Sequence, residues 1–426
     1  MSYLADLLSG LLDRRRGAPP PRLGVEDRRD PAELARALMK APGEDEQKQL
    51  AAALLERYGL LDDAEKRALF LRLSREMDVD AEAVRVAVAA YAAAPGRETY
   101  RAFADAAEPR RQELIRRVNR VTDATGRIVG IRADLLRLIR AGGDGTPMLE
   151  ALDEDFRHLL SSWFNRGFLL LRPITWKTPA ALLEKIIAYE AVHDIEGWRD
   201  LRGRLEPADR RCFAFFHPAM PDEPLIFVEV ALTCGVPVSV QGILAQDRDP
   251  IDPEAADTAC FYSISNCQPG LAGISFGNSL IKQVVADLEV ELPQLRTFVT
   301  LSPVPGLARW AAESGAGVLP DEPEGIRRLA ARYLLEAKTG TGAPRDPVAR
   351  FHLGNGARLH AIHADADTSE RGQRQSGGVM VNYLYDLPAI AQNHARFAEA
   401  YTIAAAPAIA GLAADREAGR PHSENA

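Results

Sequence analysis

Cysteine is scarce in this chain of 426 residues. Its four cysteines, Cys212, Cys234, Cys260 and Cys267, form no CxxC pair. Disulfide scaffolds and zinc ribbons need paired or clustered cysteines, so both classes of protein are excluded, and the pattern is typical of the reducing cytoplasm. We expect all four side chains to be small buried apolar groups.

Long apolar runs and an excess of positive charge are also lacking. No stretch of about 18 apolar residues occurs, which excludes a membrane-spanning helix. The 52 Lys and Arg residues against 60 Asp and Glu give a formal net charge of -8, so we expect neither a nucleic-acid partner nor a membrane. An anionic ligand must therefore be bound locally, by backbone N–H groups and a few cations.

The two ends of the chain carry no recognisable targeting signal. The apolar N-terminal residues are interrupted by Asp6 and Asp13 and are followed by Arg14, Arg15 and Arg16, whereas a signal peptide has its basic residues first. We predict a short helix and a Pro-rich connector over residues 1–28 and a polar tail over 416–426.

Residues 29–166 are predicted to form an all-helical bundle. Asp30 and Pro31 are a typical N-cap and first helical residue, and Leu69, Phe70 and Leu73 recur at helical spacing. Strand signals are nearly absent, and no acid, base or metal cluster is visible. A module of this kind more often assembles or scaffolds than catalyses.

Residues 167–415 are predicted to form an α+β domain with a mixed sheet. Strand-like segments (FLLLRPITW, RCFAFFHPAM, LIFVEVALT) alternate with helical ones, and the turn at 221–224 indicates an antiparallel hairpin. We further expect an extended segment over 235–243, a helical stretch over 304–338, a strand beginning at 351, a polar loop over 369–377 and one final helix over 388–414.

The segment 261–306 indicates a ligand more strongly than any other. A strand (FYSISN) leads through a glycine loop (QPGLAGISFGN) into an amphipathic helix, and the N-terminus of a helix binds phosphates well. The loop is neither a Walker loop nor a regular GxGxxG, so glycines that only make a turn are an equally good interpretation. Ser302 precedes a proline after the next strand, and its local sequence favours an ordinary N-cap.

The histidines suggest no metal site. His360 and His363 are three residues apart on a predicted strand, which places them on opposite faces, and no pattern completes a set of ligands. His352 is predicted to begin this strand, where a structural histidine is as good an interpretation as a functional one. The Arg371–Gln375 region is either a solvated loop or a mobile basic flap, and Tyr385 either packs in the core or reaches a site.

Six motifs taken together resemble the malonyl-CoA decarboxylase family. They are HPAMPDEPLIFVEVAL, FYSIS with its glycine loop, LIKQVV, LSPVPG, FHLGNGA and GVMVNYLY, in the family's order and spacing over about residues 165–390. The resemblance implies a helical oligomerisation domain over 29–166, a GNAT-like catalytic domain over 167–415, and a cytoplasmic homotetramer of fatty acid metabolism. It implies conversion of malonyl-CoA to acetyl-CoA and carbon dioxide without metal or cofactor, since coenzyme A is part of the substrate and product.

The resemblance also implies site residues. Ser302 and His352 match the family's catalytic pair. The matching substrate and coenzyme A positions are Ser263, Ala272, Gly273, Ile274, Ser275, Phe276, Gly277, Asn278 and Tyr385. Some members carry a glutamate where this chain has Ser275, so that carboxylate has no counterpart here.

The implied chemistry needs three actions from the protein. The carboxylate must be held out of the plane of the thioester carbonyl, the enolate must be stabilised, and a proton must reach carbon. The resemblance implies that Ser302 orients the carboxylate or relays a proton and that His352 is the donor. A GNAT-type acyltransferase using the same coenzyme A site is the alternative enzyme, and a coenzyme A sensor without catalysis is a third possibility. The presence of both Ser302 and His352 argues against the sensor.

Overall fold

The computed structural model describes residues 27–274, 280–315 and 317–414. Contacts divide the chain into two compact units. The first contains the described residues up to Leu169, His217–Glu223 and the described part of Gln268–Ser275. The second contains Leu170–Phe216, Pro224–Cys267 and the described residues after position 279. No helix of the described residues is long and apolar enough to cross a membrane.

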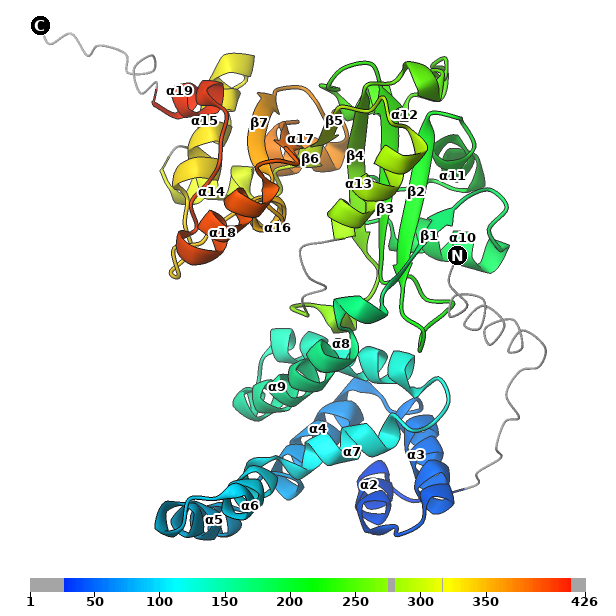
Figure 1. Cartoon of the computed structure of the whole chain (residues 1–426), viewed down its shortest axis with the longest axis vertical. Helices are drawn as coiled ribbons and strands as arrows, with labels where there is room; N and C mark the ends of the chain where they lie inside the picture. Colours follow the sequence, from blue (N-terminus) through cyan, green and yellow to red (C-terminus); the bar gives the residue numbers. More distant parts are fainter. Residues whose placement is uncertain (1–26, 275–279, 316, 415–426) are drawn as a thin grey trace, which may run out of the picture. The chain divides into compact units, whose positions relative to one another are not determined.

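The first unit is helical, as the sequence predicts (Figure 1). Its helices are α2 (Pro31–Lys40), α3 (Glu44–Tyr58), α4 (Asp63–Glu76), α5 (Ala81–Ala93), α6 (Arg97–Ala107), α7 (Arg110–Val118), α8 (Ala124–Ala141) and α9 (Thr146–Trp163), with short 3-10 turns at η1 (Arg166–Phe168) and η3 (Pro269–Leu271). Asp30 caps α2 through a capping box with Glu33, and Pro31 occupies its first turn. Leu34, Phe70 and Leu135 belong to the buried core.

The second unit combines an eight-stranded sheet with helices, which confirms the predicted mixed α+β domain. Its strands are β1 (Leu170–Ile174), β2 (Arg210–Phe216), β3 (Ile226–Thr233), β4 (Thr258–Asn266), β5 (Thr297–Thr300), β6 (Ser302–Pro303), β7 (Arg358–His363) and β8 (Met380–Leu384). Its helices are α10 (Ala180–Tyr189), α11 (Trp198–Leu205), α12 (Val240–Leu244), α13 (Leu280–Glu291), α14 (Leu307–Glu313), α15 (Pro323–Glu336), α16 (Pro347–Gly354), α17 (Glu370–Ser376), α18 (Ile390–Ala400) and α19 (Pro407–Ala414), and η2 (Pro253–Ala255) is a 3-10 turn.

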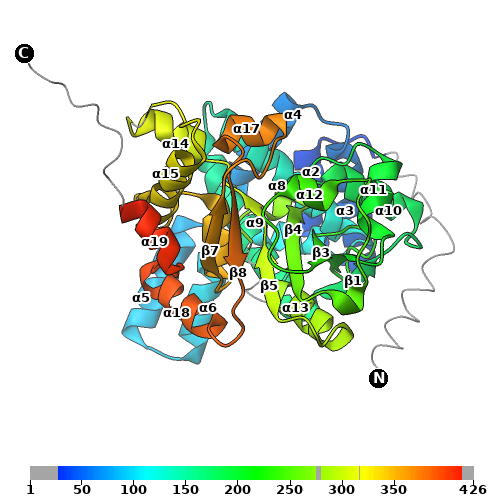
Figure 2. The same cartoon turned by 90° about the horizontal axis from the view of Figure 1, so that it is seen from above.

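The strand order places one parallel pair inside an otherwise antiparallel sheet. Neighbouring strands follow the order β1-β2-β3-β4-β5-β8-β6, and β7 pairs with β8. The hairpin of β2 and β3 is antiparallel, as predicted, whereas β4 and β5 are parallel. Parallel neighbours need a crossover connection, and the segment containing α13 supplies it. Figure 2 shows the strands side by side, with α10, α11 and α12 on one side of the sheet and α13 on the other.

Two apolar clusters hold helices against this sheet. In one, Leu183 and Ile186 of α10 and Leu201 of α11 pack with side chains of β1, β2 and β3. In the other, Ile243 of α12 packs with Tyr262 of β4 and neighbours from β5 and β8. Three of the cysteines are buried as expected, but Cys234 is exposed, so that expectation was wrong for it.

Three predicted elements differ from the structure because tertiary context and helix caps outweigh the local sequence pattern, and a fourth, the final helix, is described below. The extended segment 235–243 contains the start of α12, and the strand expected from 351 begins only at β7, because Phe351–Gly354 belong to α16. Asp346 caps α16 by accepting from the Ala349 N–H. The polar loop 369–377 is mostly α17, which begins after the N-cap Ser369.

The final helix is interrupted. Tyr401 ends α18 with a left-handed φ of 50°. The segment that follows forms a bridge between Ala405 and Leu359 of β7 before α19 begins. Pairing with the sheet therefore replaces the predicted continuous helix.

Candidate active site

Ser302 lies where the parallel strands β4 and β5 stop pairing with each other. The pairing of β4 with β5 runs from Thr258 to Phe261 on β4, and the chain after β5 then turns to pair with β8 instead. Ser302 lies in β6 directly after this departure, opposite Val381 of β8. A backbone that leaves β4 at this point makes room for a cavity beside the second half of β4.

Ser302 is a buried hydroxyl within a side-chain network. Its Oγ donates to Thr300 Oγ1 at 2.9 Å and lies 3.1 Å from His352 Nε2. Ser302 is 6% exposed and His352 3%. The N-cap favoured by local sequence is therefore wrong for Ser302, because α14 begins later and its N-cap residue is Gly306.

Tyr385 continues the network on the far side of the histidine. Its hydroxyl lies 2.9 Å from His352 Nδ1, and the Tyr383 ring stacks on the imidazole with centroids 4.5 Å apart. Because the Ser302 hydroxyl donates to Thr300, it accepts from His352 Nε2–H, and Nδ1 then accepts from the Tyr385 hydroxyl. The three residues form one directed hydrogen-bond chain, from Tyr385 through His352 to Ser302, called here the Tyr–His–Ser chain.

Burial keeps this chain electrically neutral. Loss of hydration lowers the pKa of His352 to about 3, so the imidazole is uncharged at neutral pH. Burial also raises the pKa of Tyr385 well above its ordinary value, so the phenol keeps its proton. The arrangement is therefore suited to passing a proton along neutral donors rather than to binding a charge.

The Tyr–His–Ser chain opens onto a cavity of about 390 Å³. Both Ser302 and His352 line it, together with Val192, Phe261, Tyr262, Ile264, Asn266, Pro303, Pro347, Val348 and Phe351. No arginine or lysine is among these lining residues of the described chain. The Ser302 side chain thus borders a largely apolar space of a size suited to a small ligand group.

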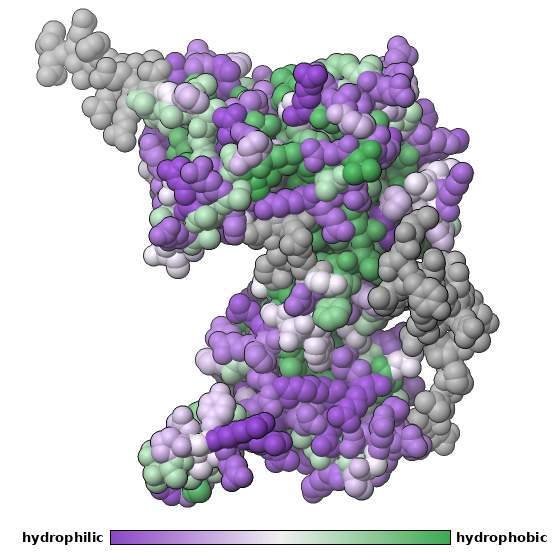
Figure 3. All heavy atoms as spheres, in the orientation of Figure 1, coloured by the Kyte–Doolittle hydropathy of each residue, from purple (hydrophilic) through white to green (hydrophobic). Residues whose placement is uncertain are grey.

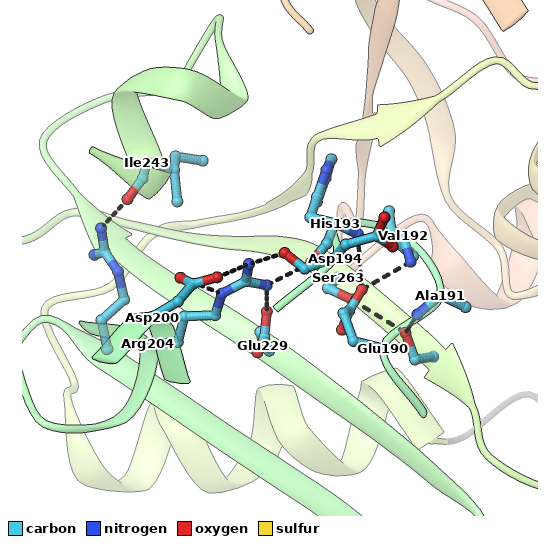
Figure 4. A network of polar contacts seen from close by, with 12 residues as sticks. Glu190, Ala191, Val192, His193, Asp194, Asp200, Arg204, Glu229, Ile243 and Ser263 are labelled. Atoms are coloured by element: carbon cyan, nitrogen blue, oxygen red, sulfur yellow. Dashed lines mark hydrogen bonds and ion pairs between the residues drawn. The ribbon is translucent and has the colours of Figure 1, made fainter. Parts of the chain in front are cut away.

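Ser263 belongs to a different polar cluster. Its hydroxyl lies 2.8 Å from both carboxylate oxygens of Glu190, which also accepts the N–H groups of Val192 and His193 (Figure 4). The structure therefore does not bring Ser263 together with Ser302. Through Glu190, Ser263 fixes the turn that carries Val192 to the cavity wall. Glu190 was missed because its partner is 73 residues away and leaves no local signal.

The described part of the predicted coenzyme A loop lies in the first unit. A Cβ on Gly270 would come within 1.8 Å of the Val129 carbonyl oxygen, so only glycine fits this approach to α8. Arg132 of α8 donates to the carbonyls of Gly270 at 2.7 Å and Ala272 at 2.9 Å. Gly273 has a φ of +75°, a left-handed conformation that glycine adopts freely.

Two further observations complete the placement of the predicted loop residues. Ile274 is buried, while Ser275, Phe276, Gly277 and Asn278 lie outside the described residues. Arg132 is 1% exposed and forms an ion pair with Asp153, but its sequence context is that of an ordinary helix residue, so it was missed. The described residues contain no group of three or more His, Cys, Asp or Glu able to hold a metal ion.

Fold and site together define a class of protein: an α+β enzyme with a neutral hydrogen-bond chain at the wall of a mostly apolar cavity. Comparison with known families specifies this class further. The model of the malonyl-CoA decarboxylase C-terminal domain matches residues 167–319 and 319–422, and that of the malonyl-CoA decarboxylase N-terminal domain matches 77–164. The chain belongs to the malonyl-CoA decarboxylase family.

Individual relatives agree with this assignment. The chain is 36% identical to the mitochondrial malonyl-CoA decarboxylase of the goose Anser anser anser over 68% of its own length and 66% of the goose protein. It is 33% identical to the mouse protein of the same name, over 72% of this chain and 71% of that protein. The chain thus spans about two thirds of the length of these curated relatives.

Solved structures extend the likeness to nearly the whole chain. The crystal structure of malonyl-CoA decarboxylase from Rhodopseudomonas palustris is 46% identical with a TM-score of 0.83, covering 89% of this chain and 98% of that one. The structure from Agrobacterium vitis gives the same identity and TM-score over 90% and 100%. The likeness therefore covers both the helical unit and the mixed-sheet unit.

Proposed function

We propose that this chain decarboxylates malonyl-CoA to acetyl-CoA and carbon dioxide, with Ser302 and His352 as catalytic residues. The observation that carries the proposal is the Tyr–His–Ser chain at the cavity wall, in a member of the malonyl-CoA decarboxylase family. Purified full chain supplied with malonyl-CoA tests it by release of acetyl-CoA and carbon dioxide. Transfer of the acyl group to an amine without free acetyl-CoA would instead support the acyltransferase.

The reaction balances with one proton taken up. The bond between the carboxylate carbon and the α-carbon breaks, its electron pair forms the thioester enolate, and carbon dioxide leaves. The enolate is a stronger base than any member of the Tyr–His–Ser chain. Ser302, whose hydroxyl donates to Thr300 in the structure, therefore turns this hydroxyl toward the enolate and donates its proton to carbon, while His352 Nε2–H reprotonates Ser302 and Tyr385 reprotonates Nδ1. Solvent then restores the proton of Tyr385.

Among the described residues of the cavity wall there is no arginine or lysine, which supports the loss of carbon dioxide from a bound carboxylate. A carboxylate transferred from water to apolar surroundings loses hydration, while the transition state spreads the same charge toward the thioester oxygen. An arginine or lysine here would stabilise the carboxylate of the substrate and oppose its loss. Within the described lining, Ser302, His352 and Asn266 supply polar side chains and the remainder is mainly apolar or aromatic.

We further propose that the loop from Ala272 to Asn278 binds the coenzyme A portion of the substrate. The tie from Arg132 and the close approach of Gly270 to Val129 hold the start of this loop rigidly on α8. A fixed backbone presents its N–H groups to phosphate without further ordering cost. Tyr385 acts in catalysis through its hydrogen bond to His352. Ser263 acts through the turn that Glu190 holds. In this proposal neither residue contacts coenzyme A directly.

Changing Gly273 to valine is expected to raise KM for malonyl-CoA about tenfold with kcat nearly unchanged. Valine cannot adopt the φ of +75° without strain, which costs on the order of 1–2 kcal/mol, although a Cβ there meets nothing within 4 Å. Gly315→Val is the matched control, because Gly315 has a φ of +77° and equally open surroundings. Steady-state kinetics of both variants measure KM and kcat. An equal rise in KM in the two variants, or no rise in Gly273→Val, would contradict the proposed binding loop.

We also propose that the helical unit assembles the chain into a homotetramer through α5 and α6. In α5 only Ala87 is buried, and α6 has no buried residue. Val86, Tyr91 and Tyr100 are 57%, 39% and 59% exposed. Figure 3 shows apolar and intermediate residues together at the end of this helical pair (lower left), and a second copy of the chain would cover them.

The double variant Val86→Lys/Tyr100→Lys is expected to shift the chain from tetramer to smaller species at micromolar concentration. Two buried ammonium groups would oppose the contact by several kcal/mol. Sedimentation velocity of the full chain measures the change. Leu60→Lys serves as the control, since Leu60 is 74% exposed and lies outside α5 and α6. A monomeric wild type, or a tetrameric double variant, would contradict this assembly.

A further inference from the structure

A second cavity of the catalytic unit is rich in arginine. It measures about 350 Å³ and lies between α11, α12 and the start of β2, with Tyr262 of β4 in its lining. Its arginines are Arg199, Arg202, Arg204, Arg210 and Arg248. None of these five belongs to the lining of the cavity at Ser302, although Tyr262 lines both. We call it the arginine cavity.

Two of these guanidinium groups are buried, which sets them apart from an ordinary solvated surface. Arg204 is 3% exposed and Arg210 5%. Figure 4 shows Arg204 between Asp200 and Glu229, to which it bonds at 3.1 and 3.2 Å. Arg210 donates to the Ile243 carbonyl at 2.7 Å and lies 3.4 Å from Asp209. Both heads are thus held in place by carbonyls and carboxylates before any ligand arrives.

Positive charge exceeds negative charge around this cavity. Asp209 is shared between Arg210 and Arg248, and Glu206 pairs with Arg202. Within the described chain Arg199 has no ion pair. The five guanidinium groups are accompanied by four carboxylates, those of Asp200, Glu206, Asp209 and Glu229. With all of these groups ionised, the net charge around the cavity is +1.

The excess becomes larger when the state of Glu229 is considered. Burial raises the pKa of Glu229 to about 8, and the neighbouring Glu190 adds to this, so much of the carboxyl is neutral at pH 7. Burial lowers the pKa of Arg210, which indicates that its charge is incompletely compensated. With Glu229 protonated, the surplus approaches two positive charges.

One buried hydroxyl also borders the cavity. Tyr262 is 1% exposed, and its hydroxyl meets the geometry of a good hydrogen bond with no described residue, although it interacts with the nearby Glu229 carboxylate and lowers the pKa of that group. Burial raises the pKa of Tyr262 well above its ordinary value, so this hydroxyl is a neutral donor. A ligand acceptor would give this buried hydroxyl a well-formed hydrogen bond.

We propose that the arginine cavity is a binding site for a phosphate-type dianion, separate from the catalytic cavity. Planar guanidinium groups bind phosphate oxygens bidentately, and the surplus charge matches a dianion. Arg199 is exposed and supplies an accessible contact, Arg248 is half-buried and already bonds both carboxylate oxygens of Asp209, and Arg204 and Arg210 form the preorganised floor. The site does not depend on the decarboxylation chemistry, because it shares neither Ser302 nor His352.

Binding of inorganic phosphate to the purified full chain tests the site directly. Calorimetry is expected to give saturable binding, and the double variant Arg199→Gln/Arg248→Gln should weaken it at least about tenfold. Arg296→Gln is the matched control, since Arg296 is exposed and lies outside the cavity lining. Arg199→Gln alone is a second probe that leaves every ion pair of the described residues intact.

A coenzyme A titration distinguishes two ligands that could supply the phosphate group: a free phosphate compound and coenzyme A itself. If saturating phosphate leaves coenzyme A affinity unchanged, the site takes a free phosphate or phosphorylated metabolite; if the two compete, it takes a phosphate of the coenzyme itself. Either result supports a phosphate site, provided that the double variant loses it. Absence of phosphate binding to the wild type, or equal binding by wild type and double variant, would overturn the proposal.

Discussion

Replacement of Ser302 by alanine is expected to lower kcat for malonyl-CoA about 10²–10⁴-fold, with little change in KM. The serine is the one member of the Tyr–His–Ser chain that lies at the cavity and also bonds to His352. Without its oxygen, His352 has no relay to the α-carbon. Because alanine removes only one buried oxygen, the free energy of unfolding should fall by about 1 kcal/mol, too little to unfold the chain.

Steady-state release of acetyl-CoA measures this loss, with circular dichroism as a check on folding. Ser314→Ala is the matched control, since Ser314 is an exposed serine of the same unit whose hydroxyl bonds only the Ala311 carbonyl. A folded Ser302→Ala variant that keeps kcat within threefold of the control removes the serine from the mechanism.

Replacement of His352 by glutamine is expected to lower kcat by a similar factor. A glutamine amide in place of Nε2–H still donates to Ser302, but it cannot accept from Tyr385 and pass a proton on. The double variant with Ser302→Ala should then be no slower than either single variant, because the residues act as one unit. If instead the loss of kcat in the double variant equals the product of the two single losses, Ser302 and His352 act independently.

The depressed pKa of His352 adds a signature in pH. In wild type, kcat should show no histidine step between pH 5 and 8, because the imidazole stays neutral down to about pH 3. The same shift affects stability: the unfolded chain binds a proton below about pH 6.5 that the folded chain excludes, so stability falls as pH falls.

The expected loss from His352 is about 1.6 kcal/mol between pH 6.5 and 5, since a full pH unit corresponds to about 1.4 kcal/mol and the unfolded histidine is only half protonated at pH 6.5. Urea unfolding of wild type and of His352→Gln at both pH values measures it as the difference between their losses, because His193, whose pKa burial lowers to about 4, also contributes to the loss in wild type. His352→Gln should remove most of this loss, whereas His158→Gln, which changes an exposed histidine of the helical unit, should leave it. Equal acid sensitivity in wild type and His352→Gln would contradict the neutral imidazole.

The order of helical and mixed-sheet parts could be predicted from the sequence because helical spacing and strand alternation act locally. The motifs also predicted the family. The geometry of the site could not be predicted from the sequence. Ser302 precedes a proline and resembles a helix cap, but it lies in β6. His352 was expected to begin a strand, but it lies on α16. Their contact joins residues 50 positions apart, which only the folded sheet brings together.

Other parts of the site left no sequence signal at all. Glu190 acts through Ser263, and Arg132 acts through two backbone carbonyls on a distant turn. The arginine cavity gathers residues from α11, β2 and the segment after α12, each of which has an ordinary local composition. Long-range polar contacts of this kind depend on tertiary geometry rather than on periodicity.

The most direct measurement of the central claim is product formation from malonyl-CoA by the full chain in deuterated water. The account predicts equal amounts of carbon dioxide and acetyl-CoA, one solvent deuterium in the new methyl group, and loss of both products in the Ser302→Ala variant. Malonyl-CoA left intact by the wild type, or products formed at the wild-type rate by Ser302→Ala, would contradict it.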